Sequence, residues 1–202
     1  KEAWLIKFAS LTDSKDIGAI EYAYHLMAEK AGLNVPKAKL FNSKRCPGYF
    51  GVQRFDRTTH GSVHVHSASG LLHADFRYPS LSYETLLKAT SWLTKSSIET
   101  ENMFKYAAFN ILAHNRDDHA RNFSFLMHPN GKWEVAPAYD LIFSSGPGGE
   151  HSTAIMGEGR NPGPKDLLRL AEATGLVKKE KAQEIILAVE EAVSHWPEIA
   201  VN

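Results

Sequence analysis

The chain has 202 residues, of which 43% are hydrophobic and 23% charged, and this composition excludes collagen-like, low-complexity and disordered proteins. Its 23 basic and 23 acidic residues balance, so no net charge draws the whole molecule to DNA or to anionic lipid. No apolar stretch approaches the roughly 18 residues of a membrane span, and the single cysteine, Cys46, cannot form an internal disulfide. We therefore expect a cytoplasmic protein with no membrane partner.

The chain begins at Lys1 without a Met and shows no signal-peptide pattern, so we expect it to be the later part of a longer protein. Residues 3–8 predict a first strand. Apolar residues at helical spacing then predict a helix that ends at Gly32, because glycine readily adopts the left-handed conformation of a helix end. Short strands are predicted at 37–41 and 49–55.

The middle of the chain is predicted to turn from loop to helix. Residues 58–79, rich in His, Ser and Gly, predict a long loop with transient strand, and a helical pattern begins at Ser82. We expect Thr100 to be the N-cap of a strong helix that breaks at His114.

A hairpin is predicted next, because an Asn-Gly pair separates the alternating apolar runs 123–127 and 132–135. The Gly- and Ser-rich residues 144–164 predict a mobile segment. Two further helices are predicted at 165–174 and 178–193. Together these elements predict an α+β fold, with a small β-containing start followed by a mainly helical body.

The densest group of polar residues, at 114–122, lies between the predicted helix and the hairpin. Within it, Asp117 and Asn122 are five residues apart, which is the spacing of the Asp and Asn in the catalytic loop of protein kinases. That spacing allows one loop to present a base to the attacking hydroxyl and an amide oxygen to Mg²⁺. Taken alone, each residue is more simply explained as a helix cap or a turn residue.

The predicted hairpin also brings a carboxylate to this loop. The strand after the turn runs through Val135 to Asp140, and a hairpin returns its second strand to the place where the first began. Asp140 would then lie near Asn122, where the two oxygens can share a hard cation. Asp140 is followed by Leu141-Ile142, whereas a eukaryotic-type kinase has Phe-Gly there.

In these segments the chain resembles the HipA-like serine/threonine kinases, which are toxins of bacterial toxin–antitoxin systems. The strongest matches, in the order found in the family, are Asp117-Asp118-His119-Ala120-Arg121-Asn122-Phe123-Ser124, Ala136-Pro137-Ala138-Tyr139-Asp140 and Val52-Gln53-Arg54-Phe55-Asp56-Arg57. Leu5-Ile6-Lys7-Phe8 and the helix before Pro36 match more weakly. The resemblance, to the C-terminal portion of the family, implies a kinase-like fold with a partial β-rich N-lobe at 1–56 and a helical C-lobe at 57–202.

The resemblance also implies roles for individual residues. Asp117 would be the catalytic base, and Asn122 and Asp140 would hold Mg²⁺. Lys7 would contact the α- and β-phosphates of ATP, with Glu21 as its candidate ion-pair partner. The other nucleotide contacts that the family implies are a hinge that binds adenine, formed by Gln53, Arg54 and Phe55, and His119. Without the resemblance, Lys7 is a solvent-facing strand residue and Arg54 belongs to a surface ion pair.

Members of this family use an upstream phosphate-binding loop with a serine whose phosphorylation blocks ATP binding. The glycines of 146–149 follow the predicted metal-binding Asp and do not match the pattern of such a loop. If residues precede Lys1, we expect them to hold the phosphate-binding loop; if none do, we expect ATP binding to be impaired or absent.

The resulting prediction is an ATP- and Mg²⁺-dependent serine/threonine protein kinase that acts on a translation factor such as an aminoacyl-tRNA synthetase. Its partner would be a HipB-like DNA-binding antitoxin, through which it would meet DNA only indirectly. Two alternatives stay open. One is a catalytically silent module that binds the antitoxin, and the other is a metal-dependent phosphohydrolase built on Asp117, Asp118, His119 and Asp140.

Two other patterns have simpler explanations. His64 and His66 alternate on one predicted strand face, but neither their spacing nor that of the other histidines fits a standard zinc site. The basic cluster at 178–181 is best explained as a solvated helix start.

Overall fold

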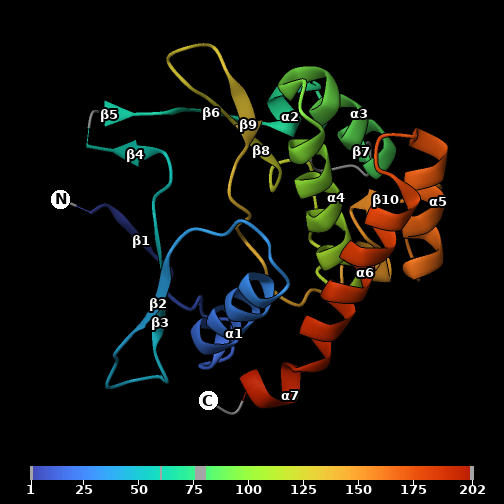
Figure 1. Ribbon diagram of the computed structural model, residues 1–202. Coiled ribbons are helices and arrows are strands. Elements are labelled where there is room, and N and C mark those ends of the chain that lie inside the picture. Colours follow the sequence, from blue (N-terminus) through green and yellow to red (C-terminus); the bar gives the residue numbers. More distant parts are fainter. Residues whose placement is uncertain (1, 60, 76–80, 201–202) are drawn as a thin grey trace.

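The computed structural model describes residues 2–59, 61–75 and 81–200. Figure 1 shows a small sheet and one helix on one side, a group of helices on the other, and a second sheet between them. The predicted α+β fold, with a small β-rich start and a mainly helical body, is confirmed.

The first sheet contains β1 (Trp4–Ile6), β2 (Ala38–Phe41) and β3 (Tyr49–Gln53). Its order is β1-β3-β2, and both pairings are antiparallel. All three strands agree with the predicted runs. Since β3 is central and antiparallel to β1, Lys7 lies beside the start of β3, where its backbone N–H donates to the Phe50 carbonyl at 2.9 Å, and Arg54 lies beside Ala3 at the other end.

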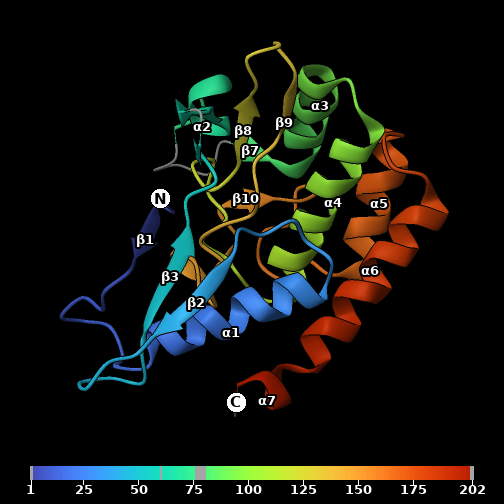
Figure 2. The same ribbon diagram turned by 60° about the vertical axis from the view of Figure 1, so that its left-hand side comes forward.

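Helix α1 (Ile17–Lys30) lies against β2 and β3 and also packs on the C-terminal helices, as Figure 2 shows. A side chain at Gly18 would place its Cβ 2.5 Å from the carbonyl oxygen of Gly48, so only glycine permits this close approach. The helix ends as predicted, with Gly32 at a φ of +75°. The contact between α1 and the sheet fixes the face of α1 that carries Glu21.

The second sheet contains β6 (His64–Ser67), β8 (Ser124–Met127) and β9 (Trp133–Val135) in the order β6-β8-β9. The predicted hairpin of β8 and β9 is confirmed, with Gly131 at a φ of +80° in its turn. Residues 58–79 were predicted as a long loop with transient strand, and they contain a regular strand, β6, which pairs with all four residues of β8. Its His and Ser residues favour strands weakly, and cross-strand pairing overrides that local preference.

The helical body contains α3 (Tyr83–Thr94), α4 (Ser97–Leu112), α5 (Pro164–Thr174) and α6 (Lys179–Ser194). Helix α4 packs on the other three, and its buried face includes Met103, Phe104 and Ala107. The shorter elements are α2 (Ala68–Leu71), β4 (Arg57–Thr58), β5 (Gly61–Ser62), β7 (Leu81–Ser82), β10 (Thr153–Ala154), a 3₁₀ turn at Pro147–Gly149 and α7 (Trp196–Ile199).

The start of α4 differs from its prediction. Ser96 is the N-cap, and its hydroxyl accepts a hydrogen bond from the backbone N–H of Glu99 at 3.3 Å. Thr100 lies one turn inside the helix, where it is buried and donates to the Ser96 carbonyl at 2.9 Å. Both residues have capping side chains, and burial of Thr100 against the core places the helix start four residues earlier.

The predicted mobile segment at 144–164 is folded onto the helical body. Strand β10 pairs in parallel with β7, and His151, Thr153 and Ile155 are buried. Gly146, at φ +71° and ψ 164°, occupies a conformation that essentially only glycine adopts, and a Cβ there would lie 2.0 Å from the Glu150 carbonyl oxygen. The glycines therefore shape a tight turn that leads back to the core.

Candidate active site

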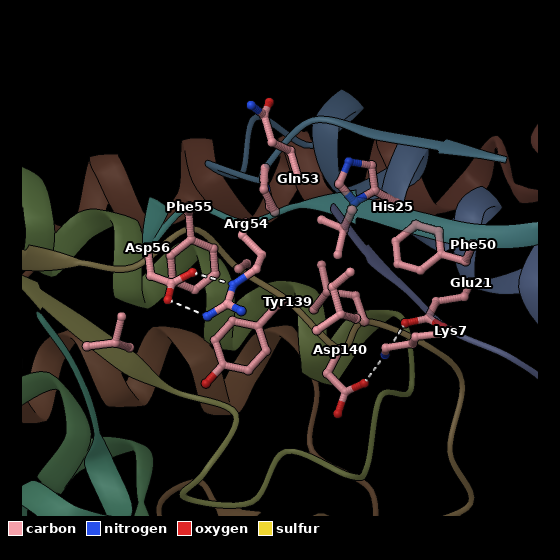
Figure 3. A pocket seen from close by; sticks show the side chains of 16 residues that line it. Lys7, Glu21, His25, Phe50, Gln53, Arg54, Phe55, Asp56, Tyr139 and Asp140 are labelled. Atoms are coloured by element: carbon pink, nitrogen blue, oxygen red, sulfur yellow. Dashed lines mark hydrogen bonds and ion pairs between the residues drawn. The ribbon is translucent and has the colours of Figure 1, made fainter. Parts of the chain in front are cut away.

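A cavity of about 530 Å³ lies between the first sheet, α1 and residues 138–141 (Figure 3). The predicted site residues that line it are Lys7, Gln53, Arg54, Phe55 and Asp140. Asp117, His119 and Asn122 do not belong to this lining, so their relation to the cavity depends on the loop that carries them.

Lys7 joins three parts of the chain within this cavity. Its Nζ donates hydrogen bonds to Glu21 Oε1 on α1 and to Asp140 Oδ1, which is 133 residues away in sequence. Burial lowers the pKa of Lys7, but the carboxylates of Asp140 and Glu21 more than offset this, and the pKa is raised. Lys7 is therefore a cation held between two acids, not the freely solvated lysine that the strand pattern alone allows.

The Glu21 carboxylate is almost fully buried, with 8% of its side chain exposed. Burial raises its pKa, and the neighbouring Lys7 lowers it only in part. A buried acid of this kind is stable only beside a cation. The structure thus brings together Lys7 and its candidate partner Glu21.

Helix α4 leads directly into the polar loop at 114–122. Asn122 closes that loop, because its Nδ2 donates to the Asp117 carbonyl at 2.8 Å and its backbone N–H donates to the His119 carbonyl at 2.9 Å. With Nδ2 engaged, the side-chain oxygen of Asn122 is the atom left to bind a ligand.

The loop and the chain segment at Asp140 lie side by side. The Tyr106 hydroxyl on α4 is 3.1 Å from the Asn122 carbonyl and 2.9 Å from the Tyr139 carbonyl. The Tyr139 hydroxyl in turn donates to the Arg121 carbonyl at 2.6 Å. The expected proximity of Asp140 and Asn122 is therefore present in the backbone.

The route to Asp140 differs from its prediction, since β9 ends at Val135 and Asp140 follows five residues later. Pro137 has no N–H to continue the strand pairing. Asp140 itself has a φ of +59°, a left-handed conformation that Asp tolerates better than most residues. This local turn directs the Asp140 side chain towards Lys7, as Figure 3 shows.

Asp117 is the most exposed acid of the group, with 53% of its side chain accessible. Partial burial raises its pKa, the nearby His119 lowers it, and the charges of Asp140 and Asp118 raise it again. His119 Nε2 lies 3.8 Å from Asp117 Oδ1. The pKa of Asp117 is therefore raised mainly by burial, with smaller contributions from the negative charges of Asp140 and Asp118.

The predicted hinge continues from β3. The backbone N–H groups of Gln53 and Arg54 already donate to Lys37 and Ala3, each at 2.8 Å. Within the described residues, the backbone N–H of Phe55 donates to no other backbone group, so it is the hinge amide that faces no competing partner. The Arg54 side chain forms an ion pair with Asp56 at 2.6 Å, as its simpler interpretation predicted.

His25 lines the same cavity and was not predicted as a site residue. It follows Glu21 by one helical turn on α1, and this spacing was the signal available in the sequence. Its ring lies 5.8 Å from that of Phe50. Burial lowers the pKa of His25. Glu29 and a hydrogen bond to the Pro36 backbone raise the pKa by a smaller amount, so the net shift is downwards.

We expect the lowered pKa of His25 to make folding weaker in acid. Below about pH 6.5 His25 is protonated in the unfolded chain but stays neutral in the folded protein until a lower pH is reached. The contribution of neutral His25 to the free energy of unfolding is therefore fully present above about pH 6.5, and it is lost as the pH falls towards the lower folded pKa. His25→Gln can still donate to Pro36 but does not titrate, so thermal unfolding between pH 7.5 and 5.5 should depend less on pH. A variant with the wild-type pH slope would contradict this assignment.

Among the described residues, no three His, Cys, Asp or Glu side chains are grouped as a metal site. The rings of His64 and His66 lie 5.8 Å apart and His64 also contacts Trp133. His60, another of the histidines, lies outside the described residues.

No helix in the described part of the chain is both long enough and apolar enough to cross a membrane.

A family model for the HipA-like C-terminal domain matches residues 1–196. The chain belongs to this family. Among curated proteins, the HipA-like domain is similar to "Putative kinase Y4dM" of Sinorhizobium fredii, with 23% identity over 89% of this chain and 44% of the relative.

Two solved structures share the fold of the HipA-like domain. A chain from the Shewanella oneidensis MR-1 complex of HipA, HipB and its operator DNA matches with a TM-score of 0.78 and 19% identity, over 97% of this chain and 52% of that one. The Helicobacter pylori proinflammatory kinase CtkA matches with a TM-score of 0.60 and 14% identity, over 98% of this chain and 87% of CtkA. The domain thus spans about half the length of Y4dM and of the Shewanella chain.

Proposed function

We propose that this HipA-like domain is the catalytic part of an ATP- and Mg²⁺-dependent serine/threonine protein kinase. The observation that carries the proposal is the contact of Lys7 with both Glu21 and Asp140 inside the cavity. Protein kinases need a Lys–Glu ion pair and a metal-binding Asp in the same site, and Lys7, Glu21 and Asp140 could supply these groups.

The cavity suits a nucleotide in size and chemistry. Its volume of about 530 Å³ falls within the usual range for small-molecule sites, and Leu5, Val52 and Phe50 supply apolar walls. We propose that the Phe55 N–H binds the adenine edge and that Lys7 contacts the α- and β-phosphates. Backbone recognition at Phe55 does not depend on the identity of the Gln53 side chain.

The oxygen atoms of Asn122 and Asp140 fit a magnesium ion. One carboxylate and one amide oxygen are hard ligands, and Mg²⁺ is commonly held by one or two protein groups together with waters and phosphates. When bound, Mg²⁺ would neutralise charge on the phosphates of the nucleotide. Asn122 is already oriented for this role by its hydrogen bond to the Asp117 carbonyl.

In the proposed reaction, Asp117 accepts the proton of the acceptor hydroxyl, and Lys7 and the hinge hold the nucleotide in position. Most of the rate enhancement then comes from positioning and electrostatics. Residues 1–56 would act as the partial N-lobe and residues 57–202 as the C-lobe. His119, beside Asp117, would complete the nucleotide-facing side of the loop.

The Shewanella complex with HipB and operator DNA supports a HipB-like antitoxin as partner of this protein. We propose a translation factor, such as an aminoacyl-tRNA synthetase, as the protein substrate, which rests on the family resemblance. Contact with DNA would be made through the antitoxin.

Both alternative functions make different demands on the same residues. A phosphohydrolase built on Asp118 is disfavoured, because that side chain has no exposed surface and is already hydrogen-bonded to Tyr83, His151 and Thr153. A silent antitoxin-binding module does not require the contact of Lys7 with two acids. Ion pairs that are withdrawn from water cost desolvation free energy, and packing alone does not need them.

The full-length protein should transfer label from [γ-³²P]ATP to serine or threonine in the presence of Mg²⁺, either on itself or on purified aminoacyl-tRNA synthetases. Phosphoamino-acid analysis identifies the acceptor residue. Free labelled phosphate without labelled protein would instead support the phosphohydrolase. The absence of heat in a calorimetric titration with Mg²⁺-ATP would support the silent module.

A further inference from the structure

A set of buried polar side chains outside the nucleotide cavity lies beneath the Asp117 loop. Asp118, next to the proposed base, has no exposed surface. Its Oδ2 accepts a hydrogen bond from the Tyr83 hydroxyl at 2.7 Å and lies 2.9 Å from His151 Nδ1, and its Oδ1 accepts one from the Thr153 N–H at 3.1 Å. The residue after Asp117 is thereby fixed to α3 and to β10.

The same hydrogen bonds continue to the other side of the site. Asn110 Nδ2 on α4 donates to the Tyr83 hydroxyl at 3.2 Å, and Asn115 Nδ2 donates to Asn110 Oδ1 at 3.0 Å. Asn115 Nδ2 also lies 3.4 Å from the backbone carbonyl of Asp140. We call Tyr83, Asn110, Asn115, Asp118 and His151 the buried network, and it runs without a break from the base loop to the metal-ligand segment.

The buried network is costly for a core that only needs to pack. Buried polar groups stabilise little on balance and cost free energy wherever a partner is missing. Within the described residues, Asn115 Oδ1 is buried with no hydrogen-bond partner. What the buried network does provide is a continuous connection between the two segments of the site.

We propose that the buried network is a positioning device that sets the separation between Asp117 and Asp140. Its members do not line the cavity, and they act through the backbone of the two site segments. Asn115 and Asp118 flank Asp117 in sequence, and Asn115 also reaches the Asp140 carbonyl, so movement of one segment is transmitted to the other.

Tyr83 lies at the centre of the buried network, because its hydroxyl contacts both Asp118 and Asn110. Burial and the adjacent Asp118 raise the pKa of Tyr83 well above its usual value, so its hydroxyl remains a donor at every pH at which the protein works. A misplacement of about 1 Å at a reacting group can cost about 100-fold in rate, so loss of the Tyr83 hydrogen bonds should lower kcat measurably.

The inference rests on the proposed kinase function, and Tyr83→Phe in the full-length protein tests it by deleting one hydroxyl. We expect kcat to fall by about 10–100-fold, while KM for ATP stays within about threefold. Tyr24→Phe is the matched control, because the Tyr24 hydroxyl is also buried but donates to the Ala113 carbonyl at 3.1 Å and not to the buried network. A kcat of Tyr83→Phe equal to that of Tyr24→Phe would overturn the proposal.

Hydrogen exchange separates this inference from the kinase function itself. In Tyr83→Phe, amides at 116–122 and at 139–141 should exchange faster together, and in Tyr24→Phe they should not. Wild-type exchange at both segments would overturn the positioning role whether or not the protein is active. If the wild-type protein transfers no phosphate, but these amides still exchange faster in Tyr83→Phe than in the wild type, the positioning role stands and only the kinase function is rejected.

Discussion

Asp117→Asn is expected to lower phosphate transfer by about 10²–10⁴-fold while Mg²⁺-ATP binding stays within a few-fold of wild type. Asn has the same shape but cannot accept the proton of the acceptor hydroxyl. The Asn122 side chain bonds to the carbonyl of residue 117, not to its side chain, so the loop should survive the change. Initial rates with [γ-³²P]ATP and calorimetric titration measure the two quantities.

The pKa of Asp117 makes this outcome specific to a base. The raised pKa of Asp117, caused mainly by partial burial, makes it a better proton acceptor than an ordinary exposed Asp. Glu150→Gln offers a control, because Glu150 is an exposed acid that pairs with Arg160 at 3.2 Å. If Asp117→Asn turned over like the wild type, the base would have to be another group; if binding were lost in parallel, Asp117 would be a phosphate anchor.

Patterns of apolar residues predicted most of the elements near this site. The 3.6-residue period identified α1, α4 and α6, and the Asn-Gly turn identified the hairpin of β8 and β9. These elements depend on local sequence. In contrast, β6 and the N-cap at Ser96 depend on pairing and burial against distant residues, so local preference predicted only transient strand at β6 and placed the N-cap at Thr100.

The site residues show the same division. The spacing of Asp117 and Asn122 was visible in one loop, but the contact of Lys7 with Asp140 spans 133 residues and was not predicted, since the family resemblance implied only Glu21 as the partner of Lys7. Its geometric cause is the sheet, in which β1 lies beside β3 and so holds Lys7 over the cavity.

The buried network could not be predicted from the sequence. Tyr83, Asp118 and His151 come from three separate segments and have no common spacing. They meet because β10 pairs with β7, which itself directly precedes Tyr83. A Tyr or Asn on the buried face of a helix does not disrupt the apolar pattern of that helix. Only the packed structure therefore identifies which polar residues face inwards.

Replacing Asp140 should produce the other large effect, because this residue is proposed to bind the metal and also contacts Lys7. We expect Asp140→Asn to reduce kcat/KM by about 10³-fold, since replacing a charged metal ligand with a neutral amide removes several kcal/mol of charge stabilisation. Asn is the suitable substitute, because it tolerates the left-handed backbone at φ +59° and changes only the charge. Mg²⁺-dependent ATP binding, measured by calorimetry, should weaken strongly.

Asp56→Asn is the matched control, because Asp56 lines the same cavity but pairs with Arg54 at the hinge. It removes the same charge from the cavity, so a general electrostatic effect would weaken Mg²⁺-ATP binding in both variants. Metal coordination predicts that only Asp140→Asn loses the dependence of binding on Mg²⁺ concentration. Equal losses in the two variants would mean that Asp140 serves as a counter-charge for Lys7, whose pKa it raises, and not as the metal ligand.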